Sequence, residues 1–393
     1  MNQIIVFPGE MNGVFLKNEI SYINDVFDKV IVLTYPGDKT EYQIIAERYN
    51  VDYYIVPVFS FYSFFISMKQ MLFDKIVRSE KKNRTFKQLL YMFLYLCWAN
   101  SAEKIFKDKC VDDNIDTVLY SFWLSRGAYA ACRIANKYKV RKTVSRAHRY
   151  DLYEERNSSQ YLPFRTFIAD TLDEIHFISE DGLNYFKGKY KDYKSKLCLS
   201  RLGTKKNSYK KLICEKDKVC IASCSSIIAV KRIDLIIDVL SKLHIPFLWI
   251  HLGDGELRGE MEKYACSKLR NGAYEFLGYV DNGEISSIYE KYDVDFFLNL
   301  SDSEGVPVSI MEAMSMGIPA IARDVGGNRE IIDGENGLLL KDTMYEQQIE
   351  QIVSKRFQKE EYEKLVNASY NIWEQNYCDE ENYKRFFDAL AKI

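Results

Sequence analysis

The stretch that decides the fold of this chain is residues 303–321, which read SEGVPVSIMEAMSMGIPAI. An apolar run of strand length, residues 296–300, precedes it. Pro307 stands where the first turn of a helix would begin, and Gly317 followed by Pro319 ends that helix before a second apolar strand. The stretch therefore predicts a strand, a turn, a helix and the next strand of a parallel sheet.

Two carboxylates frame the predicted turn. Glu304 lies in the turn and Glu312 lies inside the helix. In such units ligands bind at the carboxyl end of the sheet, beside the helix N-terminus, and carboxylates accept hydrogen bonds from sugar hydroxyls. The pattern predicts a site for a polyhydroxylated ligand. Glu312 has the alternative of an exposed, ion-paired helix residue, but the adjacent Met311 and Ala313 favour a buried helix.

Composition limits the classes of protein to consider. The chain has 393 residues, a mass of 46.1 kDa and a net charge of −2, which suits two or three domains and argues against a general nucleic-acid binder. Nine cysteines lack CxxC spacing, and we expect no secretory leader at the first residues. We expect reduced thiols in a cytoplasmic protein.

Two successive α/β halves follow from the alternation of apolar strand-length runs with helix-length segments. Predicted strands occupy residues 3–7, 29–33, 53–57, 117–120, 142–145 and 174–178, and then 219–223, 247–252, 274–277, 294–298 and 318–322. A polar, lysine-rich stretch, residues 201–217, resembles a linker. We expect an N-terminal domain over 1–205, a second domain over 206–373, and a C-terminal helix over 374–393 that packs back towards the first domain.

Several loop residues suit a phosphate-bearing ligand. Asn12 and Gly13 follow the first strand, where glycine lets backbone amides approach a ligand, although a tight turn explains them equally well. Lys231 and Arg232 precede a helical run and offer cations for a diphosphate, or else form a solvated surface pair. Gly326 and Gly327, with Glu330 just beyond, form either an anion cradle or a helix start whose dipole Glu330 complements.

Histidine offers one candidate of its own. His148 follows the strand 142–145 in a polar loop, at the active edge of such a sheet, whereas His176 lies in an apolar strand as a core residue. The spacing of the histidines with cysteines and carboxylates gives no metal-ligand pattern, so we expect no metal site.

A segment near residue 70 has the composition of a membrane-surface element. Residues 59–66 are rich in aromatics, and residues 69–87 hold seven basic and two acidic residues. Basic and aromatic residues interleaved at helical spacing suit an interfacial segment, while an ordinary amphipathic helix pair with a solvated basic face is the alternative. The longest apolar run, residues 89–99, is about half the ~20 residues that span a bilayer.

On these residues the chain resembles the family-4 retaining glycosyltransferases of the GT-B fold, which build bacterial surface polysaccharides. The likeness is strongest over residues 219–340 and rests on Glu304 and Glu312, the Lys231 loop, Gly253–Asp254–Gly255 and the Gly326–Gly327 pair. It implies an α/β chain of two Rossmann-like domains that face each other across a central cleft: an N-terminal acceptor-binding domain and a C-terminal donor-binding domain.

The resemblance also implies a role for each site residue. Glu304, His148 and Lys231 would be catalytic: Glu304 on the donor sugar's hydroxyls, His148 over that sugar, and Lys231 on the departing diphosphate. Glu312 would bind the ribose. The remaining donor-binding residues would be Asn12, Gly13, Arg232, Gly305, Val306, Pro307, Gly326 and Gly327. The family often carries an arginine where this chain has Ser226, and Arg232 is the candidate to supply that charge.

The activity implied is retaining, metal-independent hexosyl transfer without a cofactor. The donor would be a nucleotide-diphosphate sugar, with a UDP-sugar as the default, and the acceptor a glycan or lipid-linked oligosaccharide of capsule, exopolysaccharide or lipopolysaccharide biosynthesis. The protein would be cytoplasmic and peripheral at the inner leaflet. A catalytically silent GT-B partner or chaperone of another glycosyltransferase is the alternative function, and a GT-B sugar-nucleotide epimerase a further one.

Overall fold

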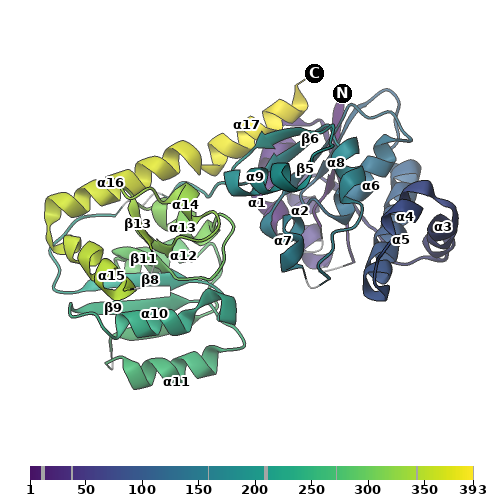
Figure 1. Cartoon of the computed structure of the whole chain (residues 1–393). Coiled ribbons are helices and arrows are strands. Elements are labelled where there is room, and N and C mark those ends of the chain that lie inside the picture. Colours follow the sequence, from purple (N-terminus) through teal and green to yellow (C-terminus); the bar gives the residue numbers. More distant parts are fainter. Residues whose placement is uncertain are drawn as a thin grey trace. The chain divides into compact units, whose positions relative to one another are not determined.

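The chain forms two compact units, each an α/β domain (Figure 1). The computed structural model describes residues 1–9, 14–36, 39–157, 159–207, 211–270, 272–341 and 344–392. The N-terminal unit comprises Met1–Ser200 and Tyr383–Ile393, and the C-terminal unit comprises Arg201–Asn382.

The N-terminal unit is built on a seven-stranded sheet of order β3-β2-β1-β4-β5-β6-β7, in which every pairing is parallel. The strand order reverses between β1 and β4, which makes their carboxyl ends the topological switch point of the sheet. The strands are β1 Asn2–Phe7, β2 Lys29–Thr34, β3 Asp52–Ile55, β4 Asp116–Ser121, β5 Lys142–Ala147, β6 Glu174–Phe177 and β7 Lys196–Leu199.

Helices connect these strands and cover the sheet (Figure 1). Side-chain caps start two of them: Ser60 and Ser63 form a capping box before α3, and Thr85 and Gln88 form one before α5. Among the residues described, no helix has both the length and the apolarity to cross a membrane. The helices are α1 Val14–Val26, α2 Lys39–Tyr49, α3 Phe61–Phe73, α4 Lys75–Glu80, α5 Phe86–Lys109, α6 Arg126–Ala135, α7 Arg149–Leu152, η1 Glu154–Arg156, α8 Arg165–Thr171 and α9 Glu180–Lys189.

The C-terminal unit repeats the plan with a six-stranded sheet of order β10-β9-β8-β11-β12-β13, again wholly parallel. Its switch point lies between β8 and β11. The strands are β8 Val219–Cys224, β9 Phe247–Leu252, β10 Tyr274–Gly278, β11 Phe296–Asn299, β12 Ala320–Arg323 and β13 Gly337–Leu340. The helices are η2 Ala229–Lys231, α10 Ile233–Leu240, α11 Arg258–Lys268, α12 Ile285–Lys291, α13 Val308–Met314, α14 Asn328–Ile331, α15 Tyr345–Ser354, η3 Lys355–Phe357 and α16 Lys359–Asn376.

The unit predicted from residues 303–321 is confirmed, since β11, α13 and β12 follow one another in that order. Pro307 occupies the N-cap of α13, one position before the predicted first turn, and its carbonyl accepts from the amides of Ile310 and Met311. The predicted fold class of two parallel, Rossmann-like α/β domains is confirmed as well.

The last helix, α17 (Asp379–Ala391), is anchored in the N-terminal unit from Tyr383 onward. Its Phe386 ring lies 4.2 Å from the guanidinium carbon of Arg146, which is fully buried on β5. Arg146 pairs with the buried Glu19 of α1, and the Tyr120 hydroxyl donates to the same carboxylate at 2.9 Å. The Phe386 ring of the last helix therefore covers the buried Arg146–Glu19 charge pair.

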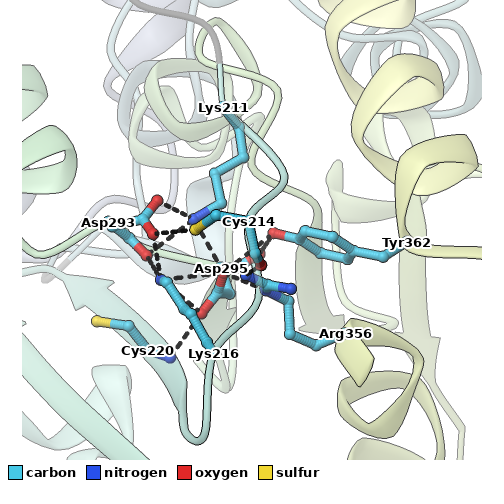
Figure 2. Close-up of polar contacts among 8 residues, drawn as sticks. All are labelled: Lys211, Cys214, Lys216, Cys220, Asp293, Asp295, Arg356 and Tyr362. Atoms are coloured by element: carbon cyan, nitrogen blue, oxygen red, sulfur yellow. Dashed lines mark hydrogen bonds and ion pairs between the residues drawn. The ribbon is translucent and has the colours of Figure 1, made fainter. Parts of the chain in front are cut away.

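A second buried ion cluster lies at the amino end of β11 (Figure 2). The fully buried Asp295 accepts from Lys211 Nζ at 2.9 Å, from Lys216 Nζ at 3.2 Å and from Arg356 Nε at 2.6 Å. Asp293 pairs with the same two lysines. Lys211 and Lys216 belong to the stretch that composition marked as a polar linker, so these two lysines are structural ion-pair partners and not solvated charges.

Candidate functional site

The loops after β8 and β11 meet at the switch point of the C-terminal unit. Lys231, the last residue of η2, donates from Nζ to Glu304 Oε1 at 2.6 Å, and Asn299 Nδ2 lies 3.3 Å from the same oxygen. The Glu304 side chain is 7% exposed and that of Lys231 is 23% exposed. Two sequence-predicted residues are therefore in direct contact, as a largely buried ion pair at the ligand-binding edge of the sheet.

The glycine pair after β12 lies against the backbone of the Glu304 loop. Gly326 has φ +52°, and a Cβ there would come within 2.0 Å of the Glu304 carbonyl oxygen. A Cβ on Gly327 would come within 2.4 Å of the Gly305 carbonyl oxygen. Glycine is required because the two loops approach too closely for any side chain. The close approach of the two loops explains why glycine occupies both positions. The helix that follows the pair, α14, is only four residues long.

Glu312 lies on α13, with its carboxyl group withdrawn from water. Desolvation raises the pKa of Glu312 to about 7. Burial raises the pKa of the Cys224 thiol to about 12, with the charge of Glu312 adding to the rise and that of Lys231 opposing it. Burial and the charges of Cys224 and Glu312 raise the pKa of Tyr289. Glu312 and Lys231 therefore both act electrostatically on the Cys224 thiol. With a pKa of about 7, the Glu312 carboxyl group is protonated in part of the molecules at neutral pH.

Val306 and Pro307 connect the Glu304 loop to α13. Val306 is buried in the core of the unit, and Pro307 caps the helix. Together with Gly305, which the Gly327 backbone contacts, they fix the loop between its two carboxylates. The predicted donor-binding residues of the C-terminal unit are therefore gathered along one loop and its neighbours.

Arg232 has partners of its own. It adopts a left-handed conformation (φ 54°) at the N-cap of α10, and its guanidinium pairs with Asp234 and with Asp302, each at 3.0 Å. These hydrogen bonds raise the pKa of Arg232. Two carboxylates hold this cation in place, so an incoming phosphate would have to compete with both.

His148 lies at the carboxyl edge of the N-terminal sheet, directly after β5. The residue is 6% exposed. Its ring stacks on Phe122, with centroids 4.6 Å apart, and lies 4.5 Å from the Trp123 ring. Neither ring nitrogen makes a hydrogen bond within the described residues, and Nδ1 is 3.9 Å from an Asp151 carboxylate oxygen. The Asp151 side chain also accepts from the His148 amide at 2.6 Å, which orients the start of α7.

Sequence reasoning missed the aromatic pair beneath His148. Phe122 and Trp123 directly follow β4, at the switch point of this sheet, and Gly9 after β1 has φ +92° with room for no Cβ, because Trp123 would be 2.3 Å away. The sequence signal that could have identified this pair is an aromatic dipeptide directly after a central strand. Asn12 and Gly13, predicted for this edge, lie outside the described residues.

The structure also gathers three potential metal ligands that sequence spacing did not suggest. Single ligand atoms of Glu174, His176 and Cys198 lie within 4.8 Å of one another on β6 and β7. The Glu174 carboxylate is already paired with Lys142 at 3.0 Å and Lys196 at 3.4 Å, and with His176 at 3.1 Å. Two lysines on one carboxylate favour an ion-pair network over a cation site.

Comparison with known proteins agrees with this geometry. Residues 204–372 match the family described as glycosyl transferases group 1, so the likeness to that family covers most of the C-terminal unit. A segment of 113 residues is 39% identical to the Escherichia coli O-antigen biosynthesis glycosyltransferase WbnH, covering 29% of this chain and 30% of that protein. The aligned segments span about a third of the length of such curated relatives.

Solved structures extend the likeness to the whole fold. The chain is similar to the lipopolysaccharide outer core galactosyltransferase WaaB, with a TM-score of 0.71, 15% identity and 99% of each chain covered. It is equally similar to Anabaena HepE in complex with UDP, with a TM-score of 0.71, 15% identity and 100% of each chain covered. At this identity the likeness establishes the fold, with two Rossmann-like domains of GT-B class.

Proposed function

We propose that this chain is a nucleotide-sugar-dependent glycosyltransferase of bacterial surface polysaccharide biosynthesis. The observation that carries the proposal is the Lys231–Glu304 ion pair at the switch point of a group 1 glycosyltransferase domain. One cation and one carboxylate in contact offer what a sugar diphosphate requires, a positive charge for phosphate and an acceptor for hydroxyls.

In the proposed donor complex, the backbone keeps the position the fold gives it, and the Lys231 side chain exchanges its partner. The Lys231 ammonium turns from Glu304 to the diphosphate, and the freed Glu304 carboxylate accepts hydrogen bonds from the donor sugar. Glu312, the fifth residue of α13, accepts from the ribose. The loop between these two carboxylates consists of Gly305, Val306 and Pro307. The Gly326–Gly327 pair packs against the backbone at its start. Asn12, Gly13 and Arg232 remain proposed contacts of the diphosphate.

The proposed reaction is retaining transfer of a hexose. The acceptor hydroxyl attacks the anomeric carbon on the face from which the diphosphate leaves, the sugar–phosphate bond breaks, and the departing phosphate oxygen takes the hydroxyl proton. Lys231 stabilises the charge that develops on that leaving group, a role worth several kcal/mol in low-dielectric sites. His148, whose ring nitrogens make no hydrogen bond within the described part of the chain and whose ring stacks on Phe122, is proposed to contact the donor sugar.

We propose a UDP-sugar as donor and a glycan or lipid-linked oligosaccharide as acceptor. Support comes from the similar HepE structure, which holds UDP, and from the O-antigen and lipopolysaccharide functions in the names of WbnH and WaaB. No metal ion or cofactor enters the proposed chemistry, because Lys231 supplies the cation at the leaving group. The alternative of a catalytically silent partner is not favoured, since Lys231, Glu304 and Glu312 are all in place.

Calorimetric titration with nucleoside diphosphates and their sugars tests the proposal. We expect the wild-type protein to bind one nucleoside diphosphate selectively, and Lys231→Ala to bind it at least about tenfold more weakly, one lost charge-assisted contact being worth ~1.5–3 kcal/mol. Lys242→Ala, an exposed lysine after α10, is the matched control. A folded wild-type protein that binds none of the nucleotides would contradict the proposal and favour the silent-partner alternative.

A further inference from the structure

Helix α3 in the N-terminal unit buries its polar face. The Ser63 and Ser67 side chains are fully buried, although both carry a hydroxyl group and the other side of α3 is exposed to solvent. Asn100 of α5 donates from Nδ2 to Ser67 Oγ at 2.8 Å and to Gln70 Oε1 at 2.9 Å. Helices of globular proteins usually bury their apolar face instead, so α3 is reversed in polarity.

The outward face of α3 is apolar. Phe61, Phe65, Met68 and Leu72 follow one another at helical spacing and are 88%, 67%, 44% and 57% exposed. Residues four and three positions apart lie on one side of a helix, so these four form a single stripe. Further exposed apolar side chains lie at the end of α3 and near the start of α5, namely Phe73, Phe86 and Leu90. A stripe of this kind marks an interaction surface.

A cavity lined by basic side chains, here called the basic hollow, lies beside α4, the helix that follows α3. Lys75, Arg78, Lys81 and Lys82 of α4 and its C-terminus, with Ser79 and Leu89, line an open cavity of about 730 Å³. No acidic residue lines this hollow within the described part of the chain. Four cations that share one hollow repel each other, and an anion such as a phosphate group relieves that repulsion.

The two acidic residues of the segment do not neutralise these cations, because each has another structural role. Asp74 caps α4 by accepting from the amides of Ile76 and Val77, at 2.9 and 3.1 Å. The Glu80 carboxylate accepts from Arg84 at 3.3 Å and from the Tyr161 hydroxyl at 2.6 Å. The positive charge of the hollow is thus left for an external partner.

We propose that the apolar stripe of α3 and the basic hollow of α4 together dock the N-terminal unit on an anionic lipid bilayer. The apolar stripe enters the boundary between headgroups and acyl chains, and the basic hollow binds lipid phosphates. Both parts are needed, since an apolar stripe alone would fit many partners and the adjacent cations select an anionic surface. Helix α3, which carries the stripe, packs against both α4 and α5 (Figure 1).

This inference goes beyond the proposed function and does not depend on it, because docking requires neither the donor site nor catalysis. It would place the protein where a lipid-linked acceptor is found. The two ideas also fail separately, since vesicle binding reports on α3 and α4, while nucleotide binding reports on Lys231 and Glu304.

Vesicle flotation of the full-length protein tests the inference, with phosphatidylcholine vesicles that contain or lack phosphatidylglycerol. One variant, Phe61→Ser/Phe65→Ser, removes two exposed rings of the stripe. A second, Lys75→Gln/Arg78→Gln/Lys82→Gln, removes three cations of the hollow and spares Lys81, whose ammonium donates to the Met71 carbonyl at 2.9 Å. The matched control, Lys139→Gln/Lys187→Gln/Lys191→Gln, removes three exposed charges elsewhere on the same unit.

We expect the wild-type protein and the control to bind anionic vesicles and to bind neutral ones far less. The three-cation variant should lose about a hundredfold in partition, because each basic residue near an anionic surface contributes roughly a fivefold factor. The aromatic variant should lose tenfold or more. Thermal unfolding and nucleotide titration of each variant verify that fold and donor site are intact, as expected for substitutions of exposed side chains.

Three results would overturn the inference. One is a folded wild-type protein that does not float with anionic vesicles. Another is equal loss of binding in the control and the three-cation variant, which would indicate non-specific attraction to net charge. The third is vesicle binding unchanged by Phe61→Ser/Phe65→Ser while self-association disappears, which would assign the stripe to a second copy of this chain.

Discussion

Lys231 and Glu304 are 73 residues apart in the sequence, and their side chains meet at 2.6 Å across the carboxyl ends of the two central strands of the C-terminal sheet. The pair joins the loop after β8 to the loop after β11, at the place where the strand order reverses. An anion that draws the Lys231 ammonium away from Glu304 would free that carboxylate to accept other hydrogen bonds. Binding of an anion and exposure of a hydroxyl acceptor are therefore coupled by one contact.

Separate and combined substitution of Lys231 and Glu304 should show how much their contact stabilises the fold. Lys231→Met leaves the nearly buried Glu304 carboxylate without its cation, and we expect it to cost about 1–3 kcal/mol in the free energy of unfolding of the C-terminal unit. Lys231→Met/Glu304→Gln should cost less than the sum of the single changes by about 1 kcal/mol. Urea unfolding measures all three. Additive effects would mean that the contact contributes nothing to stability.

Gly326→Ala should weaken nucleotide binding through the backbone. The new methyl group would come within 2.0 Å of the Glu304 carbonyl oxygen, so the loop that carries Glu304 must move. We expect a loss of about tenfold or more in nucleoside diphosphate affinity, since small displacements of a binding group are costly. Gly334→Ala is the control, because Gly334 also has a positive φ (+95°) but has open space around its Cβ position. Equal losses in both variants would point to backbone strain alone.

Glu312 should make the C-terminal unit less stable as pH rises. Its folded-state pKa of about 7 lies above the usual 4.5, so the folded protein binds this proton more tightly than the unfolded chain does. The penalty for ionising it in place is absent below pH ~4.5, grows between ~4.5 and ~7, and stays constant above that window. Glu312→Gln should therefore stabilise the unit by on the order of 2–3 kcal/mol at pH 8 and have little effect near pH 4.5.

Chemical denaturation at both pH values measures this difference. Glu363→Gln, on the exposed face of α16, provides the comparison with a solvated glutamate. A stabilisation of the Glu312→Gln variant that is the same at both pH values would contradict a raised pKa as its cause.

Asp295→Asn should unfold the C-terminal unit more readily than Asp293→Asn. Asp295 is fully buried and binds Lys211, Lys216 and Arg356, so loss of its charge leaves cations without a counter-ion in the interior. We expect a cost of about 3–5 kcal/mol. Asp293 has a 29% exposed side chain, and water can replace part of what it loses, so its variant should cost clearly less. Guanidinium unfolding of the two variants checks the order.

The missed elements of the fold have a common cause. Strands β7 and β13 were not predicted, and each is a four-residue strand at the edge of its sheet. Four residues are too few to establish a period, and pairing with one neighbour decides the conformation of an edge strand, although β3, equally short and also at an edge, was predicted. The central strands were found because both of their faces are buried, which requires an uninterrupted apolar run.

The sequence by itself determined the two α/β halves and the strand–turn–helix unit at residues 303–321, because apolar periodicity, Pro307 and Gly317 act within a few residues of the backbone they shape. It also named Lys231, Glu304, Glu312 and the Gly326–Gly327 pair as one site. Only the tertiary structure decided what those residues touch. The Lys231–Glu304 contact, the two carboxylates that occupy Arg232, the burial of Lys211 in an ion cluster and the outward aromatic stripe of α3 all depend on which distant segments the sheets bring together. Charge and polarity along the chain do not reveal whether a side chain meets water or a partner, since long-range packing sets the environment of each group.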